Sequence, residues 1–171
     1  MEFFEAVSAR HSTRDYSAEP VSEASLKKIL GAACAAPVGM GRYDALHLSV
    51  VSTPSGAAAL HARMNALFPQ DPLYNAPVFI LVSSADSPMA GQNAACIIEN
   101  VLLAAAAEGL SGCYIAGAIP KIAEDRALVR ELGVPEGFRP VAGVLVGHPR
   151  NKKELGLRRP PALEKIRMTR L

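Results

Sequence analysis

The fold is decided by two stretches of sequence, VFILV at residues 78–82 and NAACIIENVLLAAAAE at residues 93–108. The first is a continuous run of β-prone apolar residues, which is typical of a strand buried on both faces. The second is apolar at almost every position and is followed by Gly109, which predicts a helix buried nearly all round. Both stretches therefore require further structure on each side of them.

Other predicted helices and strands lie on both sides of these two stretches along the chain. Ser22 is expected to cap a helix whose apolar residues, from Leu26 to Cys34, recur three and four positions apart and form one stripe. We expect further helices at residues 2–9, 55–67 and 120–132, and further strands at residues 47–51, 112–115 and 141–146. The pattern predicts a three-layer α/β/α arrangement of the α+β class, from which no function follows yet.

Length and composition favour a single domain over residues 1–171. Half of the residues are apolar and 20% are charged, which excludes a disordered chain. No apolar run reaches the roughly 20 residues needed to span a membrane, and the first residues, MEFFE, lack the basic start of a signal peptide. We therefore expect a cytoplasmic protein that does not enter a membrane.

The three cysteines, Cys34, Cys96 and Cys113, are flanked by small or apolar residues and form no CxxC pair. An odd number of such cysteines is typical of reduced side chains in a core and predicts neither a disulfide framework nor a metal site.

Charge is unevenly distributed along the chain. Residues 150–171 carry eight basic and two acidic side chains, whereas the other 149 residues have four more acids than bases. Such a basic arm could bind nucleic acid, pack against an acidic partner subunit or hold a small phosphate. Because no aromatic residues are interleaved with the charges, nucleic acid is the weakest of the three, and we expect none as a partner.

The sequence RHSTR at residues 10–14 is the strongest local candidate for a binding site. In an extended segment, the side chains of Arg10, Ser12 and Arg14 point the same way and present two guanidinium groups and a hydroxyl. This arrangement suits a phosphate, although a solvated polar loop is an equally good interpretation of the motif alone. His11 is most simply a group that supports the backbone or faces solvent.

Four motifs, in order along the chain, resemble those of the FMN-dependent nitroreductases. They are RHSTRDY at residues 10–16, NAP at residues 75–77, ENVLLAA at residues 99–105 followed by GLSGCYI at residues 109–115, and GHP at residues 147–149 followed by RRP at residues 158–160. Each motif is weak alone, but their order and spacing together are specific. The resemblance covers residues 5–167.

The resemblance implies a role for each matching residue. Arg10 and Ser12 would bind the FMN phosphate with His11 beside them, and Arg158 and Arg159 would return to the same phosphate. At the flavin ring, Arg14 would lie near the pyrimidine edge, and the backbone N–H groups of Ala116 and Gly117 would face the N5 and O4 edge. The flavin carries the chemistry, so no side chain is expected to be catalytic.

The segment PVGMGRYDAL at residues 37–46 departs from the family pattern, because it lacks the Asn, Gln and Trp that many members carry there. Contacts with the flavin would then come from Pro37, Val38 and Gly39, through backbone or apolar groups. This departure motivates a second hypothesis, an FMN-binding storage or redox-sensing module without turnover.

The family resemblance also implies an overall architecture and activity. The expected fold is a central mixed β-sheet flanked by helices, with the C-terminal arm, residues 150–171, packing on the partner subunit of a homodimer. The expected reaction is hydride transfer from NAD(P)H through FMN to an electron-poor acceptor (a nitroaromatic, a quinone or a flavin) by a ping-pong mechanism.

Overall fold

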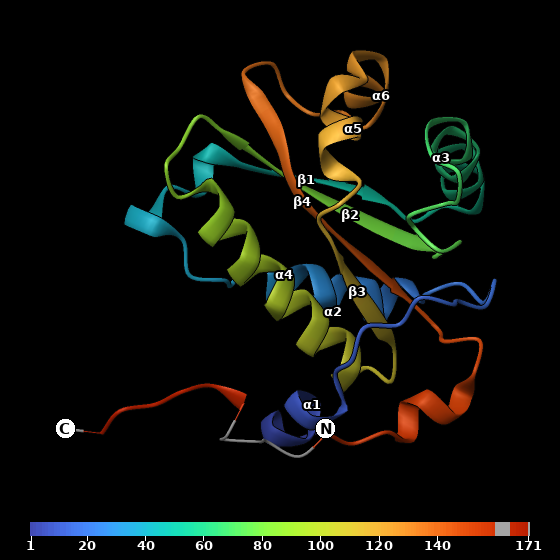
Figure 1. Ribbon diagram of the computed structural model, residues 1–171, viewed down its shortest axis with the longest axis vertical. Coiled ribbons are helices and arrows are strands. Elements are labelled where there is room, and N and C mark those ends of the chain that lie inside the picture. Colours follow the sequence, from blue (N-terminus) through green and yellow to red (C-terminus); the bar gives the residue numbers. More distant parts are fainter. Residues whose placement is uncertain (160–164, 171) are drawn as a thin grey trace.

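A computed structural model describes residues 1–159 and 165–170 of the chain. The middle layer is a four-stranded sheet in the order β1-β2-β4-β3 (Figure 1). The strands are β1 (Leu46–Val51), β2 (Val78–Ala85), β3 (Ser111–Ile115) and β4 (Phe138–Gly147). The helices are α1 (Phe3–Ala9), α2 (Glu23–Cys34), α3 (Pro54–Leu67), α4 (Ala90–Ala107), α5 (Ile119–Glu124) and α6 (Arg126–Glu131).

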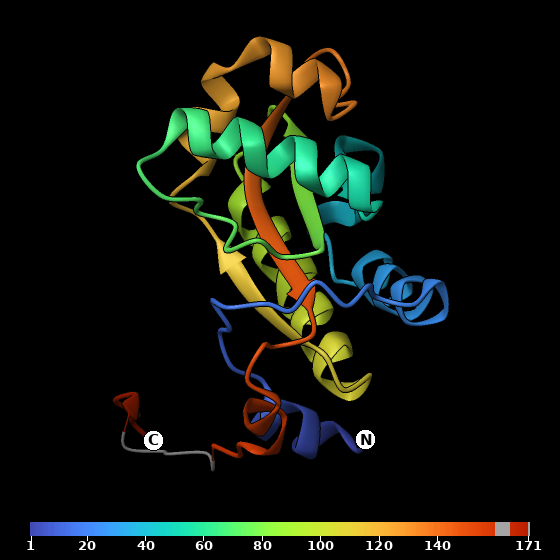
Figure 2. The ribbon, with the colours of Figure 1, turned by 90° about the vertical axis from the view of Figure 1, so that its right-hand side faces the viewer.

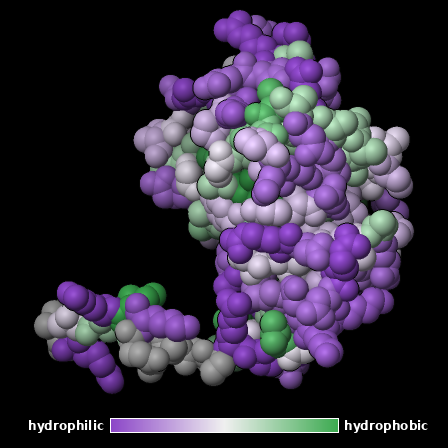
Figure 3. Space-filling model, turned by 45° about the vertical axis from the view of Figure 1, so that its right-hand side comes forward, coloured by the Kyte–Doolittle hydropathy of each residue, from purple (hydrophilic) through white to green (hydrophobic). Residues whose placement is uncertain are grey.

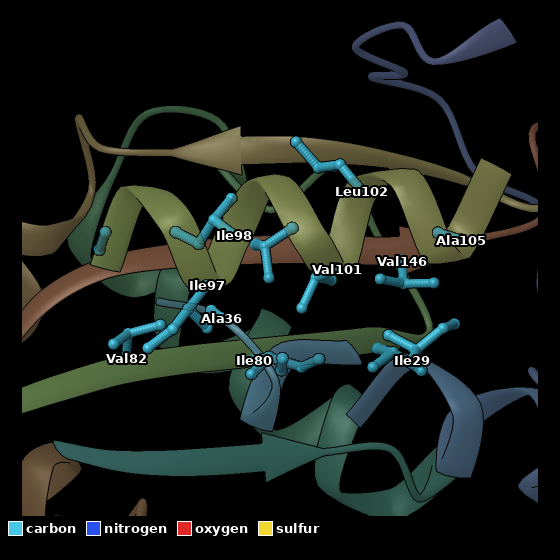
Figure 4. Packing of buried hydrophobic residues seen from close by; sticks show 14 of the residues in the cluster. Ile29, Ala36, Ile80, Val82, Ile97, Ile98, Val101, Leu102, Ala105 and Val146 are labelled. Carbon is cyan, nitrogen blue, oxygen red and sulfur yellow. The ribbon is translucent and has the colours of Figure 1, made fainter. Parts of the chain in front are cut away.

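Helices cover both faces of the sheet, as the three-layer prediction requires. Helices α2 and α4 pack on one face, and α3, α5 and α6 on the other (Figures 1 and 2). Strand β2 is buried from Val78 to Ser84 and supplies both cores. Ile80 points toward α2 and α4 (Figure 4), whereas Phe79 belongs to the core on the opposite face. The expectation of a strand buried on both faces is confirmed.

Helix α4 is less completely buried than its sequence suggests. Its buried side chains form a stripe that includes Ile97, Ile98 and Val101 and faces the sheet and α2. On the opposite side, Ala95, Glu99 and Ala107 are exposed. In this single chain the helix therefore has one covered face and one open face, on which Ala95 and Ala107 are small and Glu99 is charged.

The sheet is antiparallel in all three pairings of its strands, so the expectation of a mixed sheet is wrong for these strands. The connection from β1 to β2 explains why. After β1, helix α3 and the bends and turns of residues 68–77 return the chain to the end of the sheet that β1 has just reached, and Val51 pairs with Phe79. A parallel contact occurs only as an isolated bridge between Ser12 and Gly112 within the described chain.

The helix expected at residues 120–132 is two helices. The chain breaks at Asp125, where the backbone leaves the helical region and the side chain accepts a hydrogen bond from the N–H of Leu128. Asp125 thereby caps α6, as aspartate commonly does at a helix start. The prediction failed because Asp125 is compatible with either a helix interior or a cap.

The face seen in Figure 3 is mostly hydrophilic, with apolar residues in its upper half and smaller apolar groups at its foot and on the C-terminal arm. On α1, the side chains of Phe3, Phe4 and Val7 are exposed. Across residues 1–159 and 165–170, no helix combines the length and apolar character needed to cross a membrane. Pro160, the last residue of the late motif, lies outside the described residues.

Candidate functional site

The early loop (residues 10–17) is extended, and its side chains alternate as expected. His11 and Thr13 are buried, whereas Ser12 and Arg14 are exposed. The loop runs beside β3, where the N–H of Thr13 donates to the carbonyl of Gly112 at 3.0 Å. A side chain at Gly112 would approach Leu102 to 2.6 Å, so only glycine fits between the loop and α4.

The late arm (residues 148–159) lies beside the early loop, although the two are far apart in sequence (Figure 2). The N–H of Ser17 donates to His148, the N–H of Arg150 to Asp15, and the N–H of Arg159 to Ser8 at the end of α1, over 2.8–3.0 Å. The structure therefore brings together the two segments that the motifs single out. We call this region the loop–arm junction.

A partly buried polar cluster fastens the loop–arm junction. The carboxylate of Glu154 accepts a hydrogen bond from the hydroxyl of Thr13 at 2.8 Å and lies 3.1 Å from Nε2 of His11. The other ring nitrogen of His11 lies 2.9 Å from the carbonyl of Ala9. Both nitrogens of His11 are thus engaged within the chain, and its ring supports the loop. Sequence analysis missed Glu154 and Thr13, although the alternation of the early loop already implied an inward Thr13.

The predicted phosphate-binding arginines lie on the two segments that this cluster joins. The guanidinium of Arg10 lies 3.3 Å from the carboxylate of Glu99 on α4, and both side chains are partly exposed. Nη1 of Arg158 donates to the carbonyls of Leu155 and Leu157. Arg159 is exposed next to the end of α1. These side chains add positive charge at the loop–arm junction, where the carboxylates of Glu99 and Glu154 are opposing charges.

A cavity of about 300 Å³, the Arg14 cavity, opens where the early loop passes the end of β3. It brings together three residues that the sequence assigned to one ligand, Arg14, Ala116 and Gly117. Residues that sequence analysis did not select complete its wall: Phe68, Pro72, Tyr74, Cys113, Tyr114, Ile115 and Ala118. Most come from the loop after α3 and from β3, whose place beside Arg14 depends on the tertiary structure.

The Arg14 cavity contains a thiol but no activated nucleophile. Burial raises the pKa of Cys113, and the Arg14 guanidinium and the Ser12 hydroxyl oppose this rise only in part. A raised pKa keeps the thiol protonated at neutral pH, and the protonated form is a poor nucleophile. The described residues contain no group of three or more side chains able to hold a metal ion.

The third predicted segment lies elsewhere in this chain. Pro37, Val38 and Gly39 do not line the Arg14 cavity. The N–H of Gly39 donates to the side-chain oxygen of Asn93 at 2.9 Å, at the start of α4. Figures 1 and 2 both place this segment away from the early loop. Within one subunit, the structure therefore separates residues 37–39 from the other candidate residues.

Comparison with known proteins agrees with this arrangement of motifs. The model of the nitroreductase family matches residues 7–148, most of the chain and both the early loop and β3. The chain belongs to the nitroreductase family. The sequence-based assignment to a nitroreductase-type oxidoreductase is thereby confirmed.

Individual relatives of this nitroreductase extend over nearly its whole length. A protein of Archaeoglobus fulgidus named as an NADH dehydrogenase/NAD(P)H nitroreductase is 30% identical over 159 residues, which cover 90% of this chain and 88% of that protein. A nitroreductase with bound FMN from Bacteroides fragilis is 27% identical and has a TM-score of 0.79, with 99% of this chain and 95% of that chain covered. Another with bound FMN, from Desulfitobacterium hafniense, is 25% identical with a TM-score of 0.76, covering 99% and 100%. The α+β fold is therefore that of the nitroreductases.

Proposed function

We propose that this nitroreductase binds FMN and transfers hydride from NAD(P)H to a small electron-poor acceptor, such as a nitroaromatic, a quinone or a flavin, by a ping-pong mechanism. The observation that carries the proposal is the loop–arm junction. The early loop leads from this basic junction, along β3, to the Arg14 cavity. One ligand with a phosphate at one end and a flat ring at the other would use both regions.

The residues at the junction fit a phosphate group. Ser12 and Arg14 are exposed on the same side of the early loop, and Arg10 is partly exposed at its start. Arg158 and Arg159 lie on the late arm that is fastened to the same loop. Guanidinium groups bind phosphate oxygens through paired, charge-assisted hydrogen bonds, so Arg10, Ser12, Arg158 and Arg159 would hold the phosphate.

The Arg14 cavity fits the ring. Arg14 would place a positive charge beside the pyrimidine edge, and the exposed backbone of Ala116 and Gly117 would meet the opposite edge. When bound, FMN supplies the hydride chemistry itself. The chain would orient the ring, supply the charge that favours a negatively charged reduced form, and keep Cys113 as a neutral neighbour.

We further propose that the protein is a single FMN-binding domain over residues 1–171 that acts as a homodimer, with the arm of residues 150–171 packed on the partner. The exposed Phe3 and Phe4 on α1 and the exposed Ala95 and Ala107 on the open face of α4 support this proposal, since such apolar surface is typical of an interface. In the dimer, residues 37–39 of one subunit would meet the ring bound by the other. A cytoplasmic location and the absence of nucleic-acid partners stay predictions.

Three measurements on the purified protein test the proposal. We expect a yellow protein that releases FMN on denaturation, is dimeric by light scattering, and oxidises NADH or NADPH with menadione or a nitrofuran as acceptor. Bound FMN without NAD(P)H oxidation would favour the storage or redox-sensing module, which the altered segment at residues 37–46 motivates. Salt-sensitive DNA binding without flavin uptake would contradict the proposal.

A further inference from the structure

The loop between α3 and β2 has an unusual backbone. Leu73 and Ala76, in the second half of this loop, are buried in the core. Between them, Tyr74 and Asn75 have φ angles of 53° and 55°, in the left-handed region that residues other than glycine rarely adopt. Two such residues in succession cost free energy, so other interactions must hold this conformation.

A carboxylate and an imidazole supply these interactions. Asp71 accepts hydrogen bonds from the N–H groups of Leu73 and Asn75, both at 2.9 Å. The same carboxylate lies 2.7 Å from Nδ1 of His61 on α3, and Nε2 of His61 lies 2.9 Å from the carbonyl of Ala76. His61 therefore contacts the loop on both sides of the two left-handed residues.

Packing alone does not fix the part of the loop between Leu73 and Ala76. Tyr74 and Pro72 line the Arg14 cavity, whereas Asn75 and Pro77 line a second cavity of about 500 Å³ that His61 also borders. Tyr74 packs in part against the core, and backbone hydrogen bonds from the N–H of Tyr74 to Asp71 and from the N–H of Ala76 to Leu73 also close the turn. The Asp71 carboxylate adds its hydrogen bonds to these and, through His61, ties the turn to α3.

We propose that His61 and Asp71 are positioning residues that fix Tyr74 in the wall of the Arg14 cavity, so that flavin binding depends on one proton held by His61. This inference rests on the proposed FMN site. It assigns a role to two residues that touch neither the cavity's arginine nor the loop–arm junction, and it makes Tyr74 a determinant of the ring's fit.

The proton requirement follows from the partners of His61. Nε2 of His61 faces a carbonyl, which can only accept a hydrogen bond, whereas Nδ1 contacts the Asp71 carboxylate at an ion-pair distance without a well-directed hydrogen bond. The ring therefore holds both contacts when it carries a proton on each nitrogen and a positive charge. Burial acts to lower the pKa of His61, but the contacts with Asp71 and Ala76 outweigh it and leave this pKa above its usual value. Burial acts to raise the pKa of Asp71, yet its contacts with His61, Asn75 and Leu73 keep it below the usual value.

Asp71 is the charged group that faces His61 from the elements around it. Arg63, also on α3, pairs with Asp125. Glu19 lies next in sequence to the cavity residues Ala18 and Pro20, but its carboxylate pairs with His148 and Lys152. The ion pair between His61 and Asp71 is therefore fully formed at pH values below the ordinary histidine pKa of about 6.5 and above the pKa of Asp71. It is lost as the pH rises through the raised pKa of His61.

Hydrogen exchange of the flavin-free protein tests the positioning directly. We expect protection factors at the amides of Leu73 and Asn75 to be high at pH 6 and to fall toward pH 9. In Asp71→Asn these amides should lose protection at both pH values. The matched control Asp86→Asn, at an exposed aspartate paired with Arg139, should keep wild-type protection. Equal protection in Asp71→Asn and the control would overturn the proposal, whether or not the protein binds FMN.

Flavin titration tests the consequence for binding. Asp71→Asn should weaken FMN binding about tenfold relative to Asp86→Asn, the effect expected when one charge-assisted hydrogen bond is lost. The affinity of the wild type for FMN should decline between pH 6.5 and 8.5 more steeply than that of His61→Gln. Because FMN itself titrates equally in both experiments, the difference between the two profiles reports on His61. The proposal would be overturned if Asp71→Asn and His61→Gln both bound FMN with the wild-type affinity and the affinities of all three proteins changed with pH in parallel. Failure of every protein to bind FMN would instead contradict the proposed function and leave the exchange experiment to decide the positioning role.

Discussion

The loop–arm junction and the Arg14 cavity are built in different ways. The junction uses charged and hydroxyl side chains from two segments that are joined by backbone hydrogen bonds and by the cluster of His11, Thr13 and Glu154. The Arg14 cavity has one charged side chain, and the rest of its wall is backbone, aromatic and small apolar residues. The contrast suggests that the junction provides affinity through charge, whereas the cavity provides fit through the shape of its loops.

Removal of the carboxylate at the centre of the junction is expected to have the largest effect. Glu154→Ala leaves the buried His11 and Thr13 without their shared acceptor, which should reduce the free energy of unfolding by about 3 kcal/mol. Urea unfolding of the flavin-free protein measures this change, with the exposed neighbour Lys153→Ala as control. If both variants unfold alike, the cluster does not hold the arm.

The second-largest effect is expected from truncation of Arg10. Arg10→Ala is expected to weaken FMN binding by about 1.5–3 kcal/mol, since a hydrogen bond to a charged group is lost. Fluorescence titration with FMN measures it. Arg139→Ala, at an exposed arginine that pairs with Asp86 at the other end of β4, is the matched control and should bind FMN as the wild type does. An unchanged affinity in Arg10→Ala would refute its assigned role.

A smaller loss of FMN affinity is expected when the hydroxyl of Ser12, which lies between Arg10 and Arg14, is removed. Ser12→Ala should weaken FMN binding by about 0.5–1.5 kcal/mol, and the same substitution should leave the affinity for riboflavin unchanged, because riboflavin has no phosphate. An equal loss for both ligands would place Ser12 at the ring instead of the junction.

The smallest effect, and one of opposite sign, is expected at Glu99. Its carboxylate lies 3.3 Å from the Arg10 guanidinium and competes with a phosphate for it. Glu99→Gln should strengthen FMN binding by up to about 1 kcal/mol at low salt, and the gain should vanish at high salt, where exposed charges are screened. Glu131→Gln on α6 serves as control. A loss of affinity would mean that Glu99 helps to position Arg10.

The same contrast explains what could be predicted from the sequence. The strand at residues 78–82, the helix cap at Ser22 and the alternation of the early loop follow from local patterns, and the structure confirms them. The antiparallel sheet, the break at Asp125 and the contact of Glu154 with His11 depend on how distant segments meet, which local patterns do not determine.

Within the candidate site, the charged residues were accessible to sequence analysis because their chemistry suits few purposes. Arg10, Ser12 and Arg14 could be selected by residue type and spacing alone. Tyr74 and Cys113 could not, because aromatic and thiol side chains usually belong to a core. Their place in the cavity wall follows from the turn at Asp71 and from the position of β3.

The affinities of the flavin-free protein for FMN and for riboflavin provide the most direct test of the central claim. The two ligands differ only in the phosphate that the loop–arm junction is proposed to bind. Two or more charge-assisted hydrogen bonds predict that FMN binds at least about 100-fold more tightly than riboflavin, and that the difference shrinks in Arg10→Ala. Equal affinities for the two flavins would contradict the account.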